Sequence, residues 1–300
     1  MTIGRSVGAV TGGDGRESAT DFVLASVRQY EDRATQSSLY TCSCRCTSME
    51  RVSHHGRETA YETVDGGDGS TICLVHGTGG NRDLWQKQHA LATDRPLVTL
   101  DLSGHGDSDD IDASPGYATF SAYVDDVLAV AEATDSRVLV GGSMGGAVVL
   151  HLLLERSFRP DAVVLTGTGA RLGVLEDLLA WLENNFDRAV EFLHAQDRFF
   201  HDTDRDVVAL SKEAMYDAGQ EVTSRDFHSC HGFDVRERLS EIDVPVLVVY
   251  GEYDRLTPPW FHEYLADEIP DTDLVEIEDA AQRAMLERPE PFNEAVRSFL

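Results

Sequence analysis

Short runs of apolar residues recur along the chain and alternate with stretches of helical pattern. Six runs are expected to be strands, at residues 71–75, 96–101, 137–140, 162–166, 244–250 and 274–277. Apolar runs without polar alternation are typical of strands buried on both faces of a parallel sheet. Apolar residues at helical spacing predict helices at 120–133, 145–156, 259–269 and 291–300. The pattern therefore predicts an α/β fold, a doubly wound and mostly parallel sheet with helices on both faces.

One segment interrupts this alternation. Between Gly173 and Phe233 no run favours a strand, and apolar residues recur at helical spacing in residues 174–185 and 187–197. We interpret about 173–233 as a helical lid inserted after a strand. Ligands of open α/β sheets bind at the carboxyl edge of the sheet, and the lid is expected to cover that edge.

A glycine-rich motif follows the third predicted strand. Gly141-Gly142-Ser143-Met144-Gly145 fits G-x-S-x-G and opens a predicted helix. Glycines on both sides of Ser143 allow a sharp turn that exposes its hydroxyl, and the N–H of Met144 is placed to donate to an oxyanion. Such a motif can be a turn without catalysis, but the strand-to-helix context favours a nucleophile.

Four further motifs follow one another at spacings that resemble a known family. They are His76-Gly77-Thr78-Gly79-Gly80-Asn81, Asp101-Leu-Ser-Gly-His-Gly-Asp-Ser108, Gly251-Glu-Tyr-Asp254 and Met285-Leu-Glu-Arg-Pro289. From about Met49 to the end, the chain resembles the α/β-hydrolase superfamily, in its lid-bearing esterase and lactonase-like branch. The resemblance implies hydrolysis of a small carboxylic ester or lactone by Ser143. It also implies Asp254 as the acid of the catalytic triad and Thr78 as the second oxyanion donor.

The catalytic histidine of that family is missing. It usually precedes the M-L-E-x-P ending, where this chain has Gln282, and no histidine follows His262. A serine hydroxyl is a poor nucleophile unless a base takes its proton, and an amide has no useful basicity. Gln282 can still form hydrogen bonds, and we expect it within reach of Ser143 or Asp254.

Three interpretations remain open at this stage. The first is a serine hydrolase of reduced rate, or one that uses another base such as His228 or His231 near the end of the lid. The second is a catalytically silent relative that binds a small ligand in the same pocket. The third is a recent substitution in an otherwise normal enzyme. If a histidine replaced Gln282, we expect Arg283 to pair with Asp254 and to hold it away from the new ring.

Charge and composition limit the partners. The chain has 53 acidic and 25 basic residues, a net charge of −28, and its only lysines are Lys87 and Lys212. Such a chain should repel phosphate backbones, which argues against nucleic acid. An acid-rich, lysine-poor composition resembles proteins of halophilic archaea. No apolar run approaches the roughly 18 to 20 residues of a membrane helix, and the N-terminus lacks a secretory pattern, so we expect a cytoplasmic protein.

Residues 1–48 differ in composition from the rest of the chain. They carry five acids and five arginines, so the excess negative charge lies in 49–300. We interpret 1–48 as a disordered extension or as residues upstream of a true start at Met49, and 49–300 as the hydrolase domain. The thiols of Cys42, Cys44 and Cys46 lack an evident fourth ligand. No nucleotide loop, H-E-x-x-H or paired C-x-x-C is present, so no cofactor or metal is implied.

Overall fold

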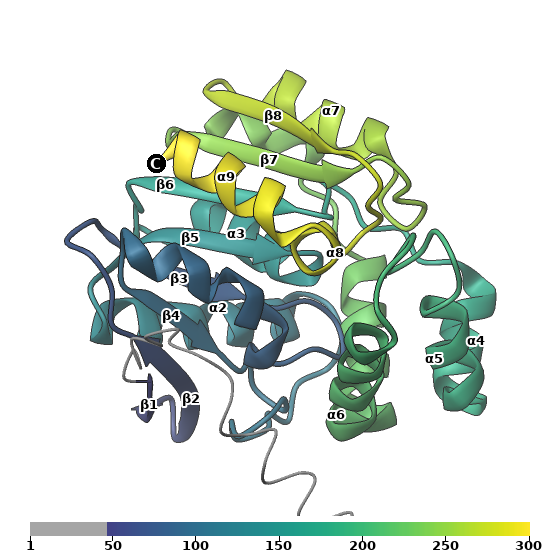
Figure 1. The fold of residues 1–300 in the computed structure, drawn as a ribbon. Coiled ribbons are helices and arrows are strands. Elements are labelled where there is room, and N and C mark those ends of the chain that lie inside the picture. Colours follow the sequence, from purple (N-terminus) through teal and green to yellow (C-terminus); the bar gives the residue numbers. More distant parts are fainter. Residues whose placement is uncertain (1–46) are drawn as a thin grey trace, which may run out of the picture. The chain divides into compact units, whose positions relative to one another are not determined.

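The computed structural model describes residues 47–300 and contains one eight-stranded sheet flanked by helices (Figure 1). The strands are β1 Thr47–His54, β2 Arg57–Val64, β3 Thr71–Val75, β4 Leu97–Leu100, β5 Ser136–Gly142, β6 Ala162–Thr166, β7 Val246–Gly251 and β8 Thr272–Ile277. Their order is β1-β2-β4-β3-β5-β6-β7-β8. β1 pairs antiparallel with β2, and β2 pairs antiparallel with β4. The six strands β3 to β8 run parallel to one another. The predicted α/β fold with a mostly parallel sheet is confirmed.

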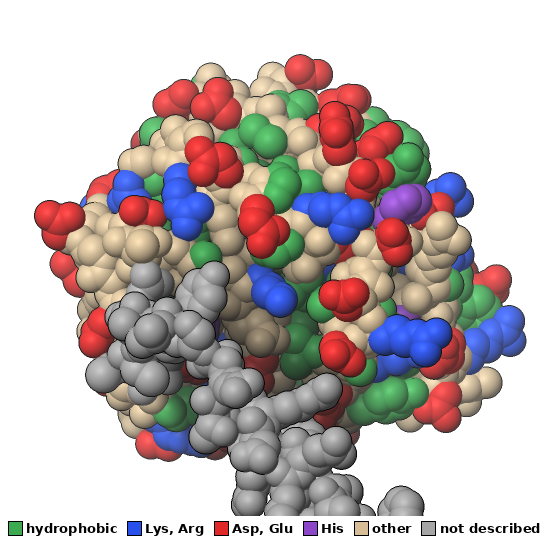
Figure 2. Space-filling model, in the orientation of Figure 1, with side chains coloured by type: hydrophobic (Ala, Val, Ile, Leu, Met, Phe, Trp, Pro, Cys, Tyr) green, Lys and Arg blue, Asp and Glu red, His purple; other side chains and the backbone are tan. Residues whose placement is uncertain are grey.

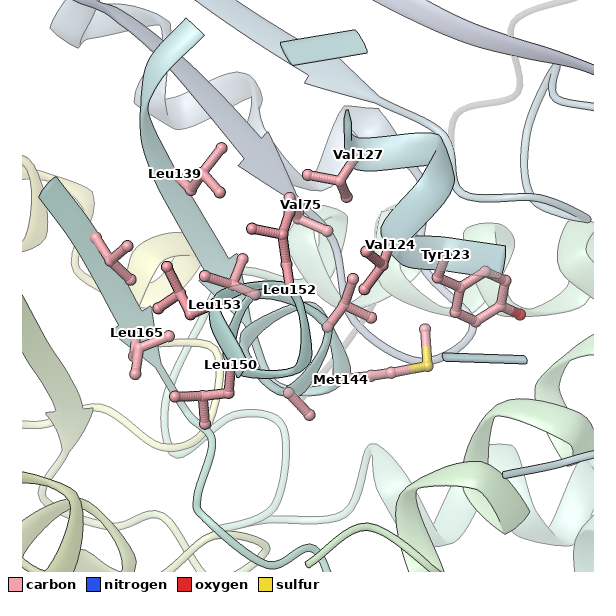
Figure 3. Close-up of a cluster of buried hydrophobic side chains, with 14 of the residues drawn as sticks. Val75, Tyr123, Val124, Val127, Leu139, Met144, Leu150, Leu152, Leu153 and Leu165 are labelled. Carbon is pink, nitrogen blue, oxygen red and sulfur yellow. The ribbon is translucent and has the colours of Figure 1, made fainter. Parts of the chain in front are cut away.

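Side chains from both faces of the sheet are buried, which explains the uninterrupted apolar runs. Along β3, Cys73 and Val75 point into one core, while Ile72 and Leu74 point into the other. Figure 3 shows part of the first core, where β3, β5 and β6 meet apolar residues of α2 and α3.

Helices cover the two faces. The first core is closed by α2 (Tyr117–Ala133), α3 (Met144–Glu155), α7 (Pro259–Glu268) and the short 3-10 helix η2 (Arg236–Glu241). The second is closed by the 3-10 helix η1 (Arg82–Thr93), α8 (Ala284–Glu287) and α9 (Pro289–Phe299). Among the described residues, no helix has the length and apolarity needed to cross a membrane.

Three helices form an insertion between β6 and β7. They are α4 (Glu176–Asn184), α5 (Phe186–Leu193) and α6 (Arg205–His231). The insertion lies past the carboxyl ends of the parallel strands, at the right of Figure 1. Inside α6, Gly219 has φ 78° and ψ 171°, so the helix is two segments that meet at this glycine.

The sequence pattern did not predict the β1–β2 hairpin. Most of β1 is exposed, so its residues form no apolar run. The strand begins at Thr47, two residues before the domain boundary expected at Met49. Apart from Thr47 and Ser48, the interpretation of residues 1–48, with its three cysteines, lies outside the described residues.

Candidate active site

Ser143 occupies the tight turn between β5 and α3. Its φ is 54° and its ψ −118°, a backbone conformation that non-glycine residues rarely adopt. The chain approaches itself so closely here that a Cβ on Gly145 would lie 2.3 Å from the carbonyl oxygen of Val75. The N–H of Ser143 donates to the carbonyl of Thr166 at 2.8 Å, which ties the turn to the end of β6. The sequence folds into this turn because glycine is the residue type that fits at such a contact.

Two backbone donors flank the serine. The loop after β3 passes close by, since a Cβ on Gly77 would lie 2.9 Å from the Cβ of Ser143. No described residue accepts a hydrogen bond from the N–H of Thr78, or from that of Met144 at the start of α3. Both N–H groups therefore remain available to an oxygen bound beside Ser143.

Two cavities meet at Ser143, and Thr78, Phe199 and Gln282 line both of them. The larger, which we call the apolar cavity, has a volume of about 280 Å³. Its walls include Leu178, Phe192, Phe227 and Cys230 of the insertion and Leu256, Trp260 and Phe261 from the segment after β7. The smaller, which we call the small chamber, holds about 10 Å³. The insertion thus covers the cavity into which Ser143 opens.

Asp254 lies in the loop after β7 and is buried. Its carboxylate accepts hydrogen bonds from the N–H groups of Leu256 and Thr257, each at 2.8 Å, and from the Thr257 hydroxyl at 2.6 Å. Burial and, to a smaller extent, the charge of Glu287 raise the pKa of this carboxyl to about 7, although the three donors lower it. No cationic group among the described residues pairs with it.

Gln282 lies beside the serine, but the hydrogen bond we expected to Ser143 or Asp254 is not formed. Its Nε2 donates instead to the carbonyl of Gly167, at 3.2 Å. Gly167 has φ 56°, and a Cβ there would lie 3.3 Å from the Cγ of Gln282. The side chain therefore packs against Gly167, and the carbonyl of that residue is the acceptor that its amide reaches.

Arg283 does not pair with Asp254 when Gln282 is in place. Its guanidinium lies over the Phe199 ring, 3.9 Å from the centroid, and donates to the hydroxyl of Ser211 in α6. No carboxylate of the described residues lies within 4.0 Å of it, and burial lowers its pKa to about 9. The aromatic wall and the hydroxyl hold it on the insertion side, away from the Asp254 loop.

The histidines considered as alternative bases lie elsewhere. His228 contacts Glu183 at 3.0 Å, and His231 contacts the backbone of Val174, while neither lines the cavities at Ser143. Of the described histidines, His76 alone lines the small chamber. Its Nε2 accepts from the N–H of Leu102 and its Nδ1 donates to Gly77, and burial lowers its pKa to about 3. The structure therefore places no available imidazole at the serine.

Sequence reasoning missed a buried polar network that contacts the loop after β3. Asp226 of α6 accepts from the N–H of Gly79 at 3.1 Å, from the Tyr123 hydroxyl at 2.7 Å and from His105 at 2.9 Å. The carboxylate lies in the insertion, 147 residues from Gly79 along the chain. The motif around His105 carried no signal for this partner.

The fold, the tight turn at Ser143 and the covered cavity together are those of the α/β-hydrolase class. The sequence profile of the alpha/beta hydrolase family matches residues 74–295, and the chain belongs to that family.

Several relatives of known activity are similar to the chain. A pimeloyl-[acyl-carrier protein] methyl ester esterase of Neisseria meningitidis is 27% identical over 248 residues, which cover 76% of this chain and 93% of that protein. A thermophilic esterase structure is 28% identical, with a TM-score of 0.74, covering 85% of this chain and 98% of that one. An N-acyl homoserine lactone degrading enzyme is 26% identical, with a TM-score of 0.73, covering 84% of this chain and 100% of that one.

Proposed function

We propose that this protein is a serine hydrolase of small carboxylic esters or lactones whose catalysis is impaired by Gln282. The observation that carries the proposal is the position of Ser143, held at φ 54° on the β5–α3 turn and open to a covered apolar cavity of about 280 Å³. The similarity to esterases and to a lactone-degrading enzyme supports the same reaction class.

The reaction follows from the geometry. The hydroxyl of Ser143 attacks the carbonyl carbon, and the negative charge on the carbonyl oxygen is stabilised by the N–H groups of Thr78 and Met144. The C–O bond to the alcohol breaks, the alcohol oxygen takes up a proton, and water then cleaves the acyl-serine to release the acid. Without an imidazole, solvent water is left to accept the serine proton, so attack is slow. Oxyanion donors and substrate binding alone retain about 10³- to 10⁴-fold acceleration over water in serine proteases that lack a triad member.

Labelling and kinetics on one activated ester test this proposal. Wild type should be labelled slowly by a fluorophosphonate and should hydrolyse p-nitrophenyl butyrate slowly, while Ser143→Ala should do neither. Equal kcat/KM values for wild type and Ser143→Ala would show that the reaction does not use this serine.

A second candidate is a catalytically silent relative that binds a ligand in the same cavity. Two observations favour it. The amide of Gln282 donates its hydrogen bond to the carbonyl of Gly167. The hydrogen-bond donors to the Asp254 carboxylate all come from its own loop. No labelling and no Ser143-dependent turnover, together with saturable binding of an apolar ligand, would select it over the first.

A further inference from the structure

The small chamber beside Ser143 is walled by polar groups without partners. The indole Nε1 of Trp85 and the hydroxyl of Thr166 have no hydrogen-bond partner, although these residues are only 0% and 1% exposed. Arg283, 4% exposed, lines the same chamber. Buried polar groups in folded proteins are nearly always bonded, so the unpartnered groups of Trp85 and Thr166 indicate a missing partner. Arg283 is bonded to Ser211, but no carboxylate of the described residues compensates its charge.

The chemistry of these groups defines that partner. Indole N–H and guanidinium groups are donors only, and a hydroxyl can donate. The available N–H of Thr78 borders the chamber as well. The missing partner is therefore an acceptor of several hydrogen bonds, and the uncompensated charge of Arg283 favours an anion over a neutral group.

Arg283 is held in place for this role by the insertion. The hydroxyl oxygen of Ser211 accepts a hydrogen bond from Arg283. The hydroxyl hydrogen of Ser211 is donated to Nε2 of His194, and this second bond is 2.6 Å long. The other nitrogen of His194 lies 2.7 Å from the carbonyl of Val190, which fixes it as the donor there. Because Ser211 is a neutral partner, this chain of bonds orients the guanidinium without neutralising it.

The two volumes specify the shape of the ligand. About 10 Å³ is close to the space of one water-sized group, so the small chamber accepts only the tip of a ligand. The adjoining apolar cavity of about 280 Å³ accepts an alkyl chain. Since Ser143 and Gln282 line both spaces, one molecule can extend through the junction from one to the other.

We propose that the small chamber binds a carboxylate oxygen beside Arg283, and that the protein binds free aliphatic carboxylic acids whose chain lies in the apolar cavity. This site goes beyond the proposed hydrolysis, because binding a free acid breaks no ester bond and needs no base.

Calorimetry with hexanoate and hexanamide tests the proposal on the full chain. The two probes share the chain and differ in charge at the head group. Measurements in about 1 M KCl screen the repulsion between hexanoate and a protein of net charge −28. Arg255 provides a matched control, because it lines the apolar cavity but is 72% exposed and already paired with Asp197 at 2.8 Å.

Wild type should bind hexanoate at least about tenfold more tightly than hexanamide. Arg283→Met should remove this preference with hexanamide binding unchanged, and Arg255→Met should keep it. If wild type binds both probes equally, the donors of the chamber are satisfied by water and the proposal fails. This comparison uses wild type alone, so it tests the proposal even if Arg283→Met does not fold. If Arg255→Met instead loses the preference for hexanoate over hexanamide, the anion binds beside Arg255 in the apolar cavity. That result would overturn the assignment to Arg283.

Discussion

At the scale of single residues, Gln282 and a histidine differ chiefly in the ability to take up a proton. The Gln282 side chain is buried and lines the small chamber together with Ser143. The loop of Asp254 adjoins the loop of Gln282, since the N–H of Tyr253 donates to Ala280 at 2.8 Å. The carboxylate of Asp254 therefore lies on the loop next to the one that carries Gln282.

Gln282→His should restore proton transfer at the serine. We expect kcat/KM on p-nitrophenyl butyrate to rise by about 10²- to 10⁴-fold, the usual contribution of a general base. The rise must vanish in the double variant with Ser143→Ala, and Gln282→Asn, which adds no base, should leave the rate low. A folded Gln282→His protein without any gain would show that the cavity has departed from hydrolysis, in favour of ligand binding.

Asp254 should make stability depend on pH. Its pKa of about 7 in the folded protein lies above the ordinary value near 4, so between these values the folded state keeps a proton that the unfolded chain has released. Stability from this group is therefore present at low pH and is lost as pH rises towards 7. Relative to wild type, Asp254→Asn should gain on the order of 3 kcal/mol between pH 5 and pH 8.

Urea unfolding of both proteins at the two pH values measures this difference. Asp112→Asn, at an exposed aspartate, controls for the loss of one negative charge. A constant difference between wild type and Asp254→Asn across this range would mean that the carboxyl of Asp254 is ionised throughout.

The candidate site was predictable where it depends on local sequence. The turn at Ser143 is built from residues within two positions of the serine, and Thr78 follows a short motif after a strand. The surroundings of Arg283 were not predictable, because Phe199 and Ser211 lie 84 and 72 residues away along the chain. The bond of Gln282 to Gly167 spans 115 residues and was missed for the same reason.

At the scale of elements, α6 is joined to the loop after β3 through Asp226. This carboxylate is fully buried, and its three donors come from the loop after β3, the loop after β4 and helix α2. It therefore fixes the insertion to the sheet and supports the loop that carries Thr78.

Asp226→Ala should lower the free energy of unfolding by about 3 to 5 kcal/mol, because it leaves three buried donors without an acceptor. Chemical denaturation followed by circular dichroism gives the value. Asp217→Ala, at an exposed position of the same helix, should change it by less than about 0.5 kcal/mol. Similar small effects for the two variants would contradict the anchoring role.

The elements themselves were predicted best where burial is complete. The expected runs at 71–75 and 162–166 coincide with β3 and β6, both buried almost throughout. The exposed strand β1 has no apolar run to reveal it, and its pairing with β2 depends on a turn at His55 and Gly56. In the insertion, the helical pattern was visible, but the interruption of α6 at Gly219 was not.

At the scale of the whole molecule, charge governs stability. Acidic side chains are spread over the face shown in Figure 2, among fewer basic ones. Like charges at this density repel one another in the folded state, and salt screens that repulsion.

The melting temperature should therefore rise with KCl from dilute to molar concentration. Screening is nearly complete at about 1 M, so a further rise above that would indicate ion binding or exclusion. Thermal unfolding monitored at several KCl concentrations gives this curve. A melting temperature that does not change with salt would count against adaptation to a salt-rich cytosol.

The interruption at Gly219 divides α6 into two segments, and we expect them to open at different rates. A Cβ at Gly219 would meet nothing within 4 Å, and its φ and ψ suit glycine alone. The segment after Gly219 is anchored by Asp226, while the segment before it carries Ser211. We expect the two segments to open on different time scales, because Asp226 fixes only the later one to the sheet. Amide hydrogens of residues 205–218 should then exchange with deuterium sooner than those of residues 222–231.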